Sequence, residues 1–158
     1  MISRAKAIAA ILAEVSAELS AMESLAGDAR DEATSGETKS EGKYDTRATE
    51  ASYLARGQAW RIVELGRLSA WLKTQADTGS AVDPTVRLGC LVQITGARTE
   101  LLYLAPIGGA KADLEGTIIR VISPSSPLGR AMTGLEAGDG FEIETPRGLL
   151  EYEIEGVG

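Results

Sequence analysis

The first half of the chain carries two long runs of apolar residues at helical spacing, and no proline interrupts them. Residues 1–77 contain none of the five prolines. In the first run, apolar residues recur at intervals of four and three: Ile8, Leu12, Val15, Leu19, Met22 and Ala26. The second run keeps this rhythm with some small or polar members: Ala51, Ala55, Gln58, Ile62, Leu65, Ser69 and Leu72. The spacing predicts two helices of about 30 residues, each roughly 45 Å long, with one apolar stripe apiece.

Two such stripes can be buried in either of two ways. Joined by a polar turn, the helices cover each other as an antiparallel coiled-coil hairpin. As one continuous helix, the chain would instead pair with a second copy in a homodimeric coiled coil. The dimer needs helix through Gly36 and Gly42, and glycine is unfavourable in a helix interior. We therefore expect a hairpin over residues 1–77 and a monomeric chain.

The expected turn between the helices is rich in charge. Between residues 28 and 45, six carboxylates stand against three basic residues: Asp28, Asp31, Glu32, Glu37, Glu41 and Asp45 against Arg30, Lys39 and Lys43. A tip in solvent needs polar residues, which accounts for most of these charges. An acidic tip near residues 34–45 would nevertheless hold carboxylates far from the body of the chain. That arrangement suits delivery of acid groups into another molecule.

The composition changes near residue 80. All five prolines follow it, and residues 78–84 have the composition of a linker. Residues 85–158 predict a small β-rich domain with strands at 91–95, 100–104, 117–122, 141–145 and 149–156. A short helix is expected from 127 to 133, because a proline suits the first turn of a helix. The expected fold class is α+β, a helical hairpin followed by a β-rich domain.

The composition also excludes several classes of function. The chain has no histidine, which removes Ser-His and Cys-His nucleophile pairs and every His-ligated metal site. Cys90 is the single cysteine, so a cysteine cluster and an intramolecular disulfide are excluded. A formal net charge of −7 argues against binding nucleic acid mainly through phosphate contacts. With no signal peptide and no stretch of about 18 apolar residues, we expect a cytoplasmic chain with no membrane partner.

An ordered series of landmarks lies in the last quarter of the chain. It runs Ile122-Ser123-Pro124-Ser125-Ser126-Pro127-Leu128-Gly129-Arg130-Ala131-Met132, then Gly134, Gly138-Asp139, Thr145-Pro146-x-Gly148 and Glu151-Tyr152-Glu153-Ile154. The hairpin half adds Gly36-Glu37 and Ser40-Glu41 ahead of Tyr44. With these motifs the chain resembles the bacterial Gre transcript-cleavage factors, the GreA/GreB family, over nearly its whole length.

The resemblance implies an architecture and a mode of action. Gre factors join an N-terminal antiparallel coiled coil to a C-terminal domain with an FKBP-like fold. That domain docks on the rim of the secondary channel of bacterial RNA polymerase, and the coiled coil enters the channel toward the RNA 3′ end. Two acids at the tip help to hold Mg²⁺ at the polymerase's own active site. The chain would then be a transcription elongation factor that stimulates cleavage of backtracked RNA, with no cofactor of its own and no enzymatic activity in itself.

The resemblance also implies site residues by position. Counted back from Tyr44, Glu37 falls on the first tip acid, with Glu where the family has Asp. Ser40 occupies the place of the second acid, and the nearest carboxylate is Glu41, one residue later. Glu37 and Glu41 are thus the implied tip acids and Mg²⁺ ligands. The shift leaves two functions open, which are stimulation of cleavage and secondary-channel regulation that modulates or inhibits the polymerase without promoting cleavage. The implied docking residues are Ser125, Ser126, Pro127 and Leu128.

Other readings rest on single features. An FKBP-like fold raises the possibility of prolyl isomerase activity. Such sites are apolar pockets built largely from aromatic residues, and the domain offers only Tyr103, Phe141 and Tyr152. Trp60 and Trp71 are expected to pack within the protein, and Cys90 to be a buried or half-buried thiol. A basic stripe on the second helix is explained most simply as a solvated face, although it could also bind RNA or guide the hairpin along a polyanionic channel: Arg47, Arg56, Arg61, Arg67 and Lys73.

Overall fold

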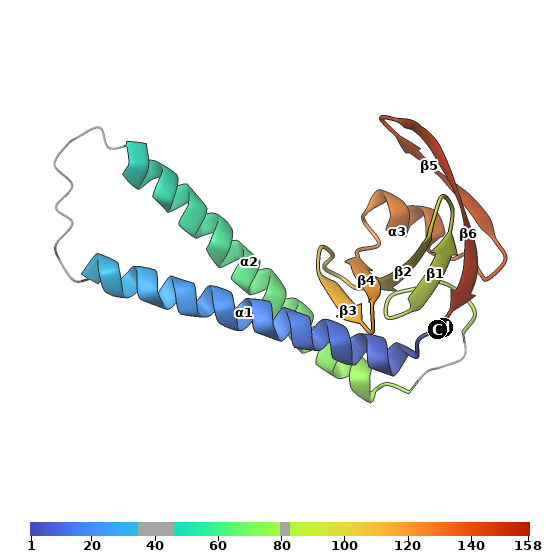
Figure 1. Ribbon diagram of the computed structural model, residues 1–158, viewed down its shortest axis with the longest axis horizontal. Helices are drawn as coiled ribbons and strands as arrows, with labels where there is room; N and C mark the ends of the chain where they lie inside the picture. Colours follow the sequence, from blue (N-terminus) through green and yellow to red (C-terminus); the bar gives the residue numbers. More distant parts are fainter. Residues whose placement is uncertain (35–45, 80–82) are drawn as a thin grey trace.

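The computed structural model describes residues 1–34, 46–79 and 83–158, without the side chains of residues 29–34 and 46–51. Two long helices, α1 (Arg4–Thr34) and α2 (Thr46–Asp77), project together from a β-rich domain (Figure 1). The predicted helical hairpin followed by a β-rich domain is confirmed. Glu37 and Glu41 lie outside the described residues, as do residues 80–82 of the expected linker.

The β-rich domain is built on one six-stranded sheet. Its elements in chain order are β1 (Leu91–Thr95), β2 (Thr99–Leu104), β3 (Lys111–Leu114), β4 (Thr117–Ile122), α3 (Pro127–Met132), β5 (Gly140–Thr145) and β6 (Gly148–Val157). The strand order is β3-β4-β2-β1-β6-β5. Strands β2 and β4 pair in parallel, and all other neighbours pair antiparallel.

Strand β3 is absent from the prediction, which otherwise places each strand end within a residue of its observed position. Its four residues include no β-branched side chain, so the segment has little intrinsic strand preference. The tight turn between β3 and β4 accounts for the strand, because it places this segment beside β4. Glu115 and Gly116 both take positive φ values, 55° and 83°, and the Asp113 carboxylate accepts a hydrogen bond from the Gly116 N–H at 2.8 Å. Such a two-residue turn sets the register of the hairpin.

The base of the helical hairpin and one face of the sheet share a single hydrophobic core. Neighbouring residues of a strand point to opposite faces of a sheet, so alternate residues enter this core. Its large buried members are Ile8, Ile11, Val15, Leu65, Leu68 and Leu72 from the helices and Leu91, Leu101, Tyr103, Ile119 and Val121 from the sheet. Helix α3 lies on the opposite face of the sheet from the hairpin (Figure 1). A second core lies there, made of Val86, Cys90, Val92, Ile94, Leu102, Leu104, Ile122, Met132 and Ile154.

The two predicted stripes are buried only near the sheet. Ile8 and Val15 on α1, and Leu65 and Leu72 on α2, are buried as expected. Farther out, Ala55 and Gln58 are exposed, so the stripe is wrong over that part of α2. The helices diverge there as they leave the sheet (Figure 1), and a stripe with no facing partner stays in solvent.

Two further expectations concern Cys90 and the tryptophans. Cys90 is buried, as expected, and its thiol lies 3.7 Å from the Thr85 carbonyl oxygen. Trp71 packs in the protein, with its ring centroid 6.1 Å from that of Tyr103. Trp60 does not, because 61% of it is exposed. The packing prediction is therefore right for Trp71 and wrong for Trp60.

Arg4 joins three separate segments at the base of the hairpin. Its Nε donates to the Gly89 carbonyl at 2.6 Å, next to the start of β1. Its two terminal nitrogens donate to the Thr78 carbonyl at 3.1 Å and to Gln75 Oε1 at 3.0 Å, at the end of α2. These bonds fix the start of α1 against both the second helix and the sheet.

Tyr103→Phe tests how the buried hydroxyl of Tyr103 affects the stability of the shared core. Tyr103 is fully buried, and its hydroxyl has no hydrogen-bond partner among the described residues. Burial raises the pKa of Tyr103 from 10.0 to about 12. Above pH 10 the unfolded chain loses this proton while the folded chain keeps it, so wild-type stability falls as pH rises from about 10 to 12.

We expect the variant to be as stable as wild type at pH 7, or more stable by up to about 1 kcal/mol. It should also lose less stability between pH 10 and 12, as measured by urea unfolding at each pH. A clear loss of stability in the variant at pH 7 would mean that the hydroxyl has a partner and would contradict this reasoning.

Candidate functional site

The segment between β4 and α3 presents the residues implied for docking. Ser126 is the N-cap of α3, with φ −68° and ψ 155°. Its Oγ accepts a hydrogen bond from the Gly129 N–H at 3.0 Å and donates one to the Ser123 carbonyl at 2.7 Å. Pro127 follows in the first turn, where its lack of an N–H leaves no helical bond unmade. The cap and the proline together fix where the helix begins.

The four implied docking residues divide into two kinds. Ser125 and Pro127 are exposed, whereas Ser126 is half-buried and committed to the cap. Leu128 is half-buried against the core under α3. Ser125 and Pro127 are thus the two that face solvent, and Ser126 and Leu128 hold them in place.

Glycines on both sides keep this segment close to its neighbours. A Cβ on Gly129 would lie 2.1 Å from the Ser123 carbonyl oxygen, which is backbone and cannot move aside. A Cβ on Gly108 would lie 2.9 Å from the Ser123 nitrogen. Close packing on two sides gives the segment a defined shape, as a recognition surface needs.

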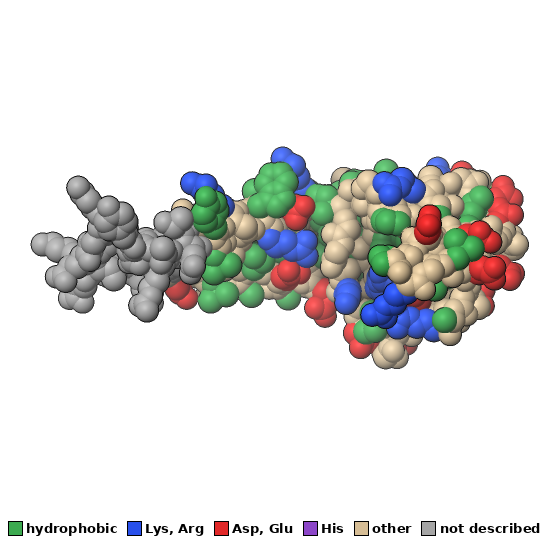
Figure 2. Space-filling model, turned by 90° about the horizontal axis from the view of Figure 1, so that it is seen from above, with side chains coloured by type: hydrophobic (Ala, Val, Ile, Leu, Met, Phe, Trp, Pro, Cys, Tyr) green, Lys and Arg blue, Asp and Glu red, His purple; other side chains and the backbone are tan. Residues whose placement is uncertain are grey.

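The implied tip acids cannot be placed, but the helices that flank them can. The described ends of α1 and α2, at Thr34 and Thr46, lie at the end of the hairpin far from the sheet (Figure 1). Figure 2 shows, in a second view, a narrow arm that projects from a wider body. With 31 residues, α1 is about 46 Å long. Glu37 and Glu41 therefore belong to the segment that joins the two far ends.

The basic stripe of α2 is partly used within the hairpin. Arg61 lies 3.4 Å from Glu18 on α1 and 3.7 Å from Glu64 on its own helix. Arg56 lies over the ring of Tyr53, 5.7 Å from its centroid. Arg67 and Lys73 are exposed. The stripe thus helps to hold the helices together as well as presenting charge to solvent.

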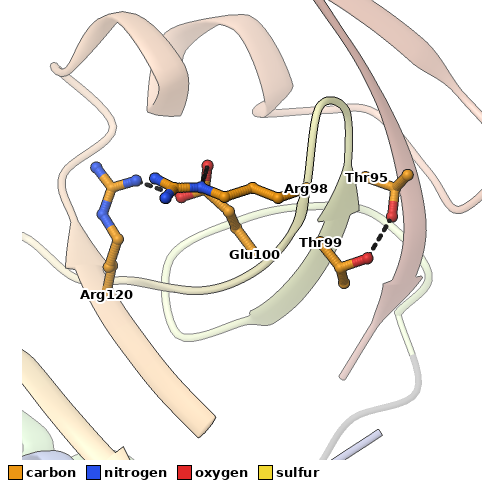
Figure 3. Close-up of polar contacts among 5 residues, drawn as sticks. All are labelled: Thr95, Arg98, Thr99, Glu100 and Arg120. Carbon is orange, nitrogen blue, oxygen red and sulfur yellow. Dashed lines mark hydrogen bonds and ion pairs between the residues drawn. The ribbon is translucent and has the colours of Figure 1, made fainter.

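A second polar cluster, absent from the predicted site residues, lies on the sheet (Figure 3). The Glu100 carboxylate forms ion pairs with Arg98, at 3.4 Å, and with Arg120 on β4. Thr99, the neighbour of Glu100, faces the other way, where its hydroxyl lies 3.0 Å from that of Thr95. The parallel pairing of β2 with β4 brings Glu100 and Arg120 together. Their one sequence signal is that both are charged residues within apolar strands.

Residues 1–34, 46–79 and 83–158 contain no group of three or more acidic or cysteine side chains that could hold a metal ion. Nor does this part of the chain contain a helix long and apolar enough to cross a membrane.

Ser126→Ala should destabilise the domain, and Ser125→Ala should not. The first change removes both bonds of the cap and is expected to lower the free energy of unfolding by about 1 kcal/mol. The second removes an exposed hydroxyl and should change stability by less than about 0.5 kcal/mol. Urea unfolding of the two variants measures the difference. Equal losses would contradict the role of Ser126 as the cap.

Comparison with known proteins covers both the domain and a longer part of the chain. The family model described as "Transcription elongation factor, GreA/GreB, C-term" matches residues 82–158. A transcription elongation factor GreA of Cereibacter sphaeroides is 31% identical over 113 residues, which cover 68% of this chain and 69% of the relative. A GreA of Legionella pneumophila is 43% identical over 56 residues, covering 35% of this chain and 32% of the relative.

Solved structures give a looser likeness. The transcription factor Gfh1 matches with a TM-score of 0.39 and 16% identity, covering 94% of this chain and 93% of that one. A GreA/GreB factor from Nitrosomonas europaea matches with a TM-score of 0.36 and 24% identity, covering 72% of this chain and 94% of that one. At these scores the structures add no argument, and the sequence relatives decide the family. The chain belongs to the GreA/GreB family of transcription elongation factors.

Proposed function

We propose that the chain binds bacterial RNA polymerase through its β-rich domain and stimulates the polymerase's cleavage of backtracked RNA with its hairpin. The domain docks on the rim of the secondary channel, and the hairpin enters the channel as far as the RNA 3′ end. The observation that carries the proposal is 31% identity to a GreA over 113 residues, together with a hairpin that projects from the domain.

The division of labour follows from the shape of the molecule. Ser125 and Pro127 lie at the start of α3, which belongs to the β-rich domain and lies well away from the far ends of the helices (Figure 1). A helix of about 46 Å is long enough to carry a group deep into a channel while its base stays outside. Docking and chemistry are therefore assigned to different ends of the chain.

Glu37 and Glu41 are the groups proposed to act at the far end. Carboxylate oxygens are donors that Mg²⁺ accepts, and this ion keeps several waters when only one or two carboxylates bind it. An ion held there supplies charge stabilisation at the phosphate being cleaved. The two glutamates would share the ion with the polymerase and orient the attacking water, which makes the chain an accessory to cleavage.

A second possible function stays open because of the position of the second tip acid. Ser40 stands where the family has its second acid, and Glu41 is displaced by one position. If Glu41 does not reach the ion, the chain would enter the channel and modulate the polymerase without promoting cleavage. The experiment on the tip acids separates the two functions.

Glu37→Ala/Glu41→Ala should abolish most cleavage while leaving binding intact. A stalled, backtracked elongation complex is incubated with wild type, with this variant, and with Glu23→Ala/Asp28→Ala, which removes the same charge from exposed positions of α1. Wild type and the control should release short 3′ RNA fragments. The tip variant should be slower by about 10- to 100-fold, as expected when groups that position a metal are lost.

Two other results have clear meanings. Wild type that binds the complex and alters elongation without releasing fragments would favour the regulator over the cleavage factor. Wild type that fails to bind the polymerase would overturn the proposal as a whole.

Pro127→Ala should weaken binding to the polymerase, and Pro146→Ala should not. Both prolines are exposed in the β-rich domain, but Pro146 lies in the turn between β5 and β6. Loss of an interface contact worth more than about 1 kcal/mol raises Kd by a factor of about five or more. Titration of labelled chain with polymerase measures this, and cleavage at saturating Pro127→Ala should match wild type. Equal affinities for the two variants would remove Pro127 from the docking surface.

A further inference from the structure

Helix α3 covers only part of its face of the sheet. Leu102 on β2 and Ile122 on β4 lie in the core with α3. Strand alternation puts Glu100 on the same face as Leu102, and Arg120 and Ile118 on the same face as Ile122. These earlier residues of the two strands lie outside that core. Ile118 is 50% exposed and the Arg120 side chain 41% exposed.

The uncovered area borders a hollow of about 920 Å³. Five of its lining residues define what we call the basic groove: Arg98, Glu100, Lys111, Ile118 and Arg120. The groove continues on both sides. Toward α3, Lys111 and Arg120 also line a hollow of about 380 Å³ that includes Ser123 and Ser126. Toward β6, Arg98 and Glu100 also line a hollow of about 540 Å³ that includes Leu149, Leu150 and the acidic Glu151.

Positive charge exceeds negative charge in the basic groove. It holds two arginines and one lysine against the single carboxylate of Glu100, in a chain whose formal net charge is −7. Lys111 stands directly opposite Arg120 in the β3–β4 ladder. Like charges at opposed positions of a sheet destabilise it, and one carboxylate cannot neutralise three cations. The arrangement costs stability in the free chain and favours an acidic ligand.

Glu100 keeps the arginines in place without saturating them. It is 11% exposed and pairs with both Arg98 and Arg120 (Figure 3). A guanidinium has five N–H donors, so each arginine keeps donors for another acceptor. The Arg98 side chain is 76% exposed and lies open to such a ligand.

We propose that the basic groove is a second docking surface, which takes a segment of the polymerase that carries both acidic and apolar side chains. The inference rests on the proposed function, which supplies the partner. The hollow that includes Ser126 adjoins the groove, and the exposed docking residues Ser125 and Pro127 flank Ser126 in the chain, so one partner segment can contact these residues and the groove together. Exposed Ile118, and Leu149 and Leu150 beyond Arg98, offer apolar surface that a polypeptide can use. The carboxylate in the middle of the groove disfavours a phosphate backbone.

The test compares two pairs of substitutions that remove the same charge. Arg98→Ala/Lys111→Ala removes two exposed cations of the groove, and Lys6→Ala/Arg147→Ala removes two exposed cations elsewhere. Kd for RNA polymerase is measured from about 50 mM to about 500 mM salt, because salt screens exposed charges. We expect the groove variant to bind about five- to tenfold more weakly at low salt and nearly as tightly as wild type at high salt. The control should stay within about twofold of wild type throughout.

Two single substitutions keep the test independent of folding. Lys111 forms no ion pair with another described residue, so Lys111→Gln removes its charge while leaving the Glu100 pairs intact and should weaken binding in the same salt-dependent way. Ile118→Ser should weaken binding equally at low and high salt. Unchanged thermal unfolding of each variant shows that the domain is folded.

The possible failures are distinguishable. Wild type that does not bind polymerase overturns the proposed function, and this inference with it. Wild type that binds while the groove variants and the control bind equally well overturns the inference alone. Groove variants that lose affinity for a free RNA oligonucleotide but keep full affinity for polymerase would assign the groove to nucleic acid, which also overturns it.

Discussion

One shared hydrophobic core decides how this molecule is built. The same cluster contains Ile8 and Leu65 from the helices and Tyr103 and Ile119 from the sheet, so neither part completes its core without the other. Because apolar burial is the main favourable contribution to folding, the direction of the hairpin is set together with the fold of the domain. Arg4 strengthens the junction with directional hydrogen bonds to the end of α2 and to the segment before β1. A helical hairpin on a flexible tether would have neither constraint.

The opposite face of the sheet is covered less completely. A helix of only six residues covers it in part, which leaves charged and apolar side chains of the same strands uncovered. The turn before α3 is packed closely enough to have one shape, and the basic groove continues from it across β4 and β2. The two faces thus differ: the hairpin covers one of them, and the other leaves charged and apolar side chains in solvent, where we propose that the polymerase binds.

Much of this fold could be predicted from the sequence, and the failures have physical causes. The helices followed from heptad spacing, and most strands from β-branched residues between glycine and proline turns. Strand β3 was missed because its formation depends on a turn in which Glu115 takes a positive φ, which no local preference indicates. Ile11 is buried because α1 contacts the sheet as well as α2, a contact that heptad spacing does not report. The basic groove depends on the parallel pairing of β2 with β4, so its residues, distant in sequence, could not be grouped in advance. Among the implied docking residues, the resemblance gave their positions but not the division between exposed Ser125 and Pro127 and the cap formed by Ser126.

The shared core also makes the hairpin a lever. Beyond Val15, the last fully buried residue of α1 in the shared core, 19 residues span about 28 Å, so a rotation of about 5° at the base would move the far end of α1 by about 2.5 Å. Misplacement of a reacting group by about 1 Å is enough to slow catalysis greatly. The position of the far end therefore depends on buried side chains of the shared core, such as Leu68 and Val121. A small change in side-chain volume at these positions would produce a larger displacement at the far ends of the helices. The packing of the shared core therefore determines the direction in which the hairpin projects.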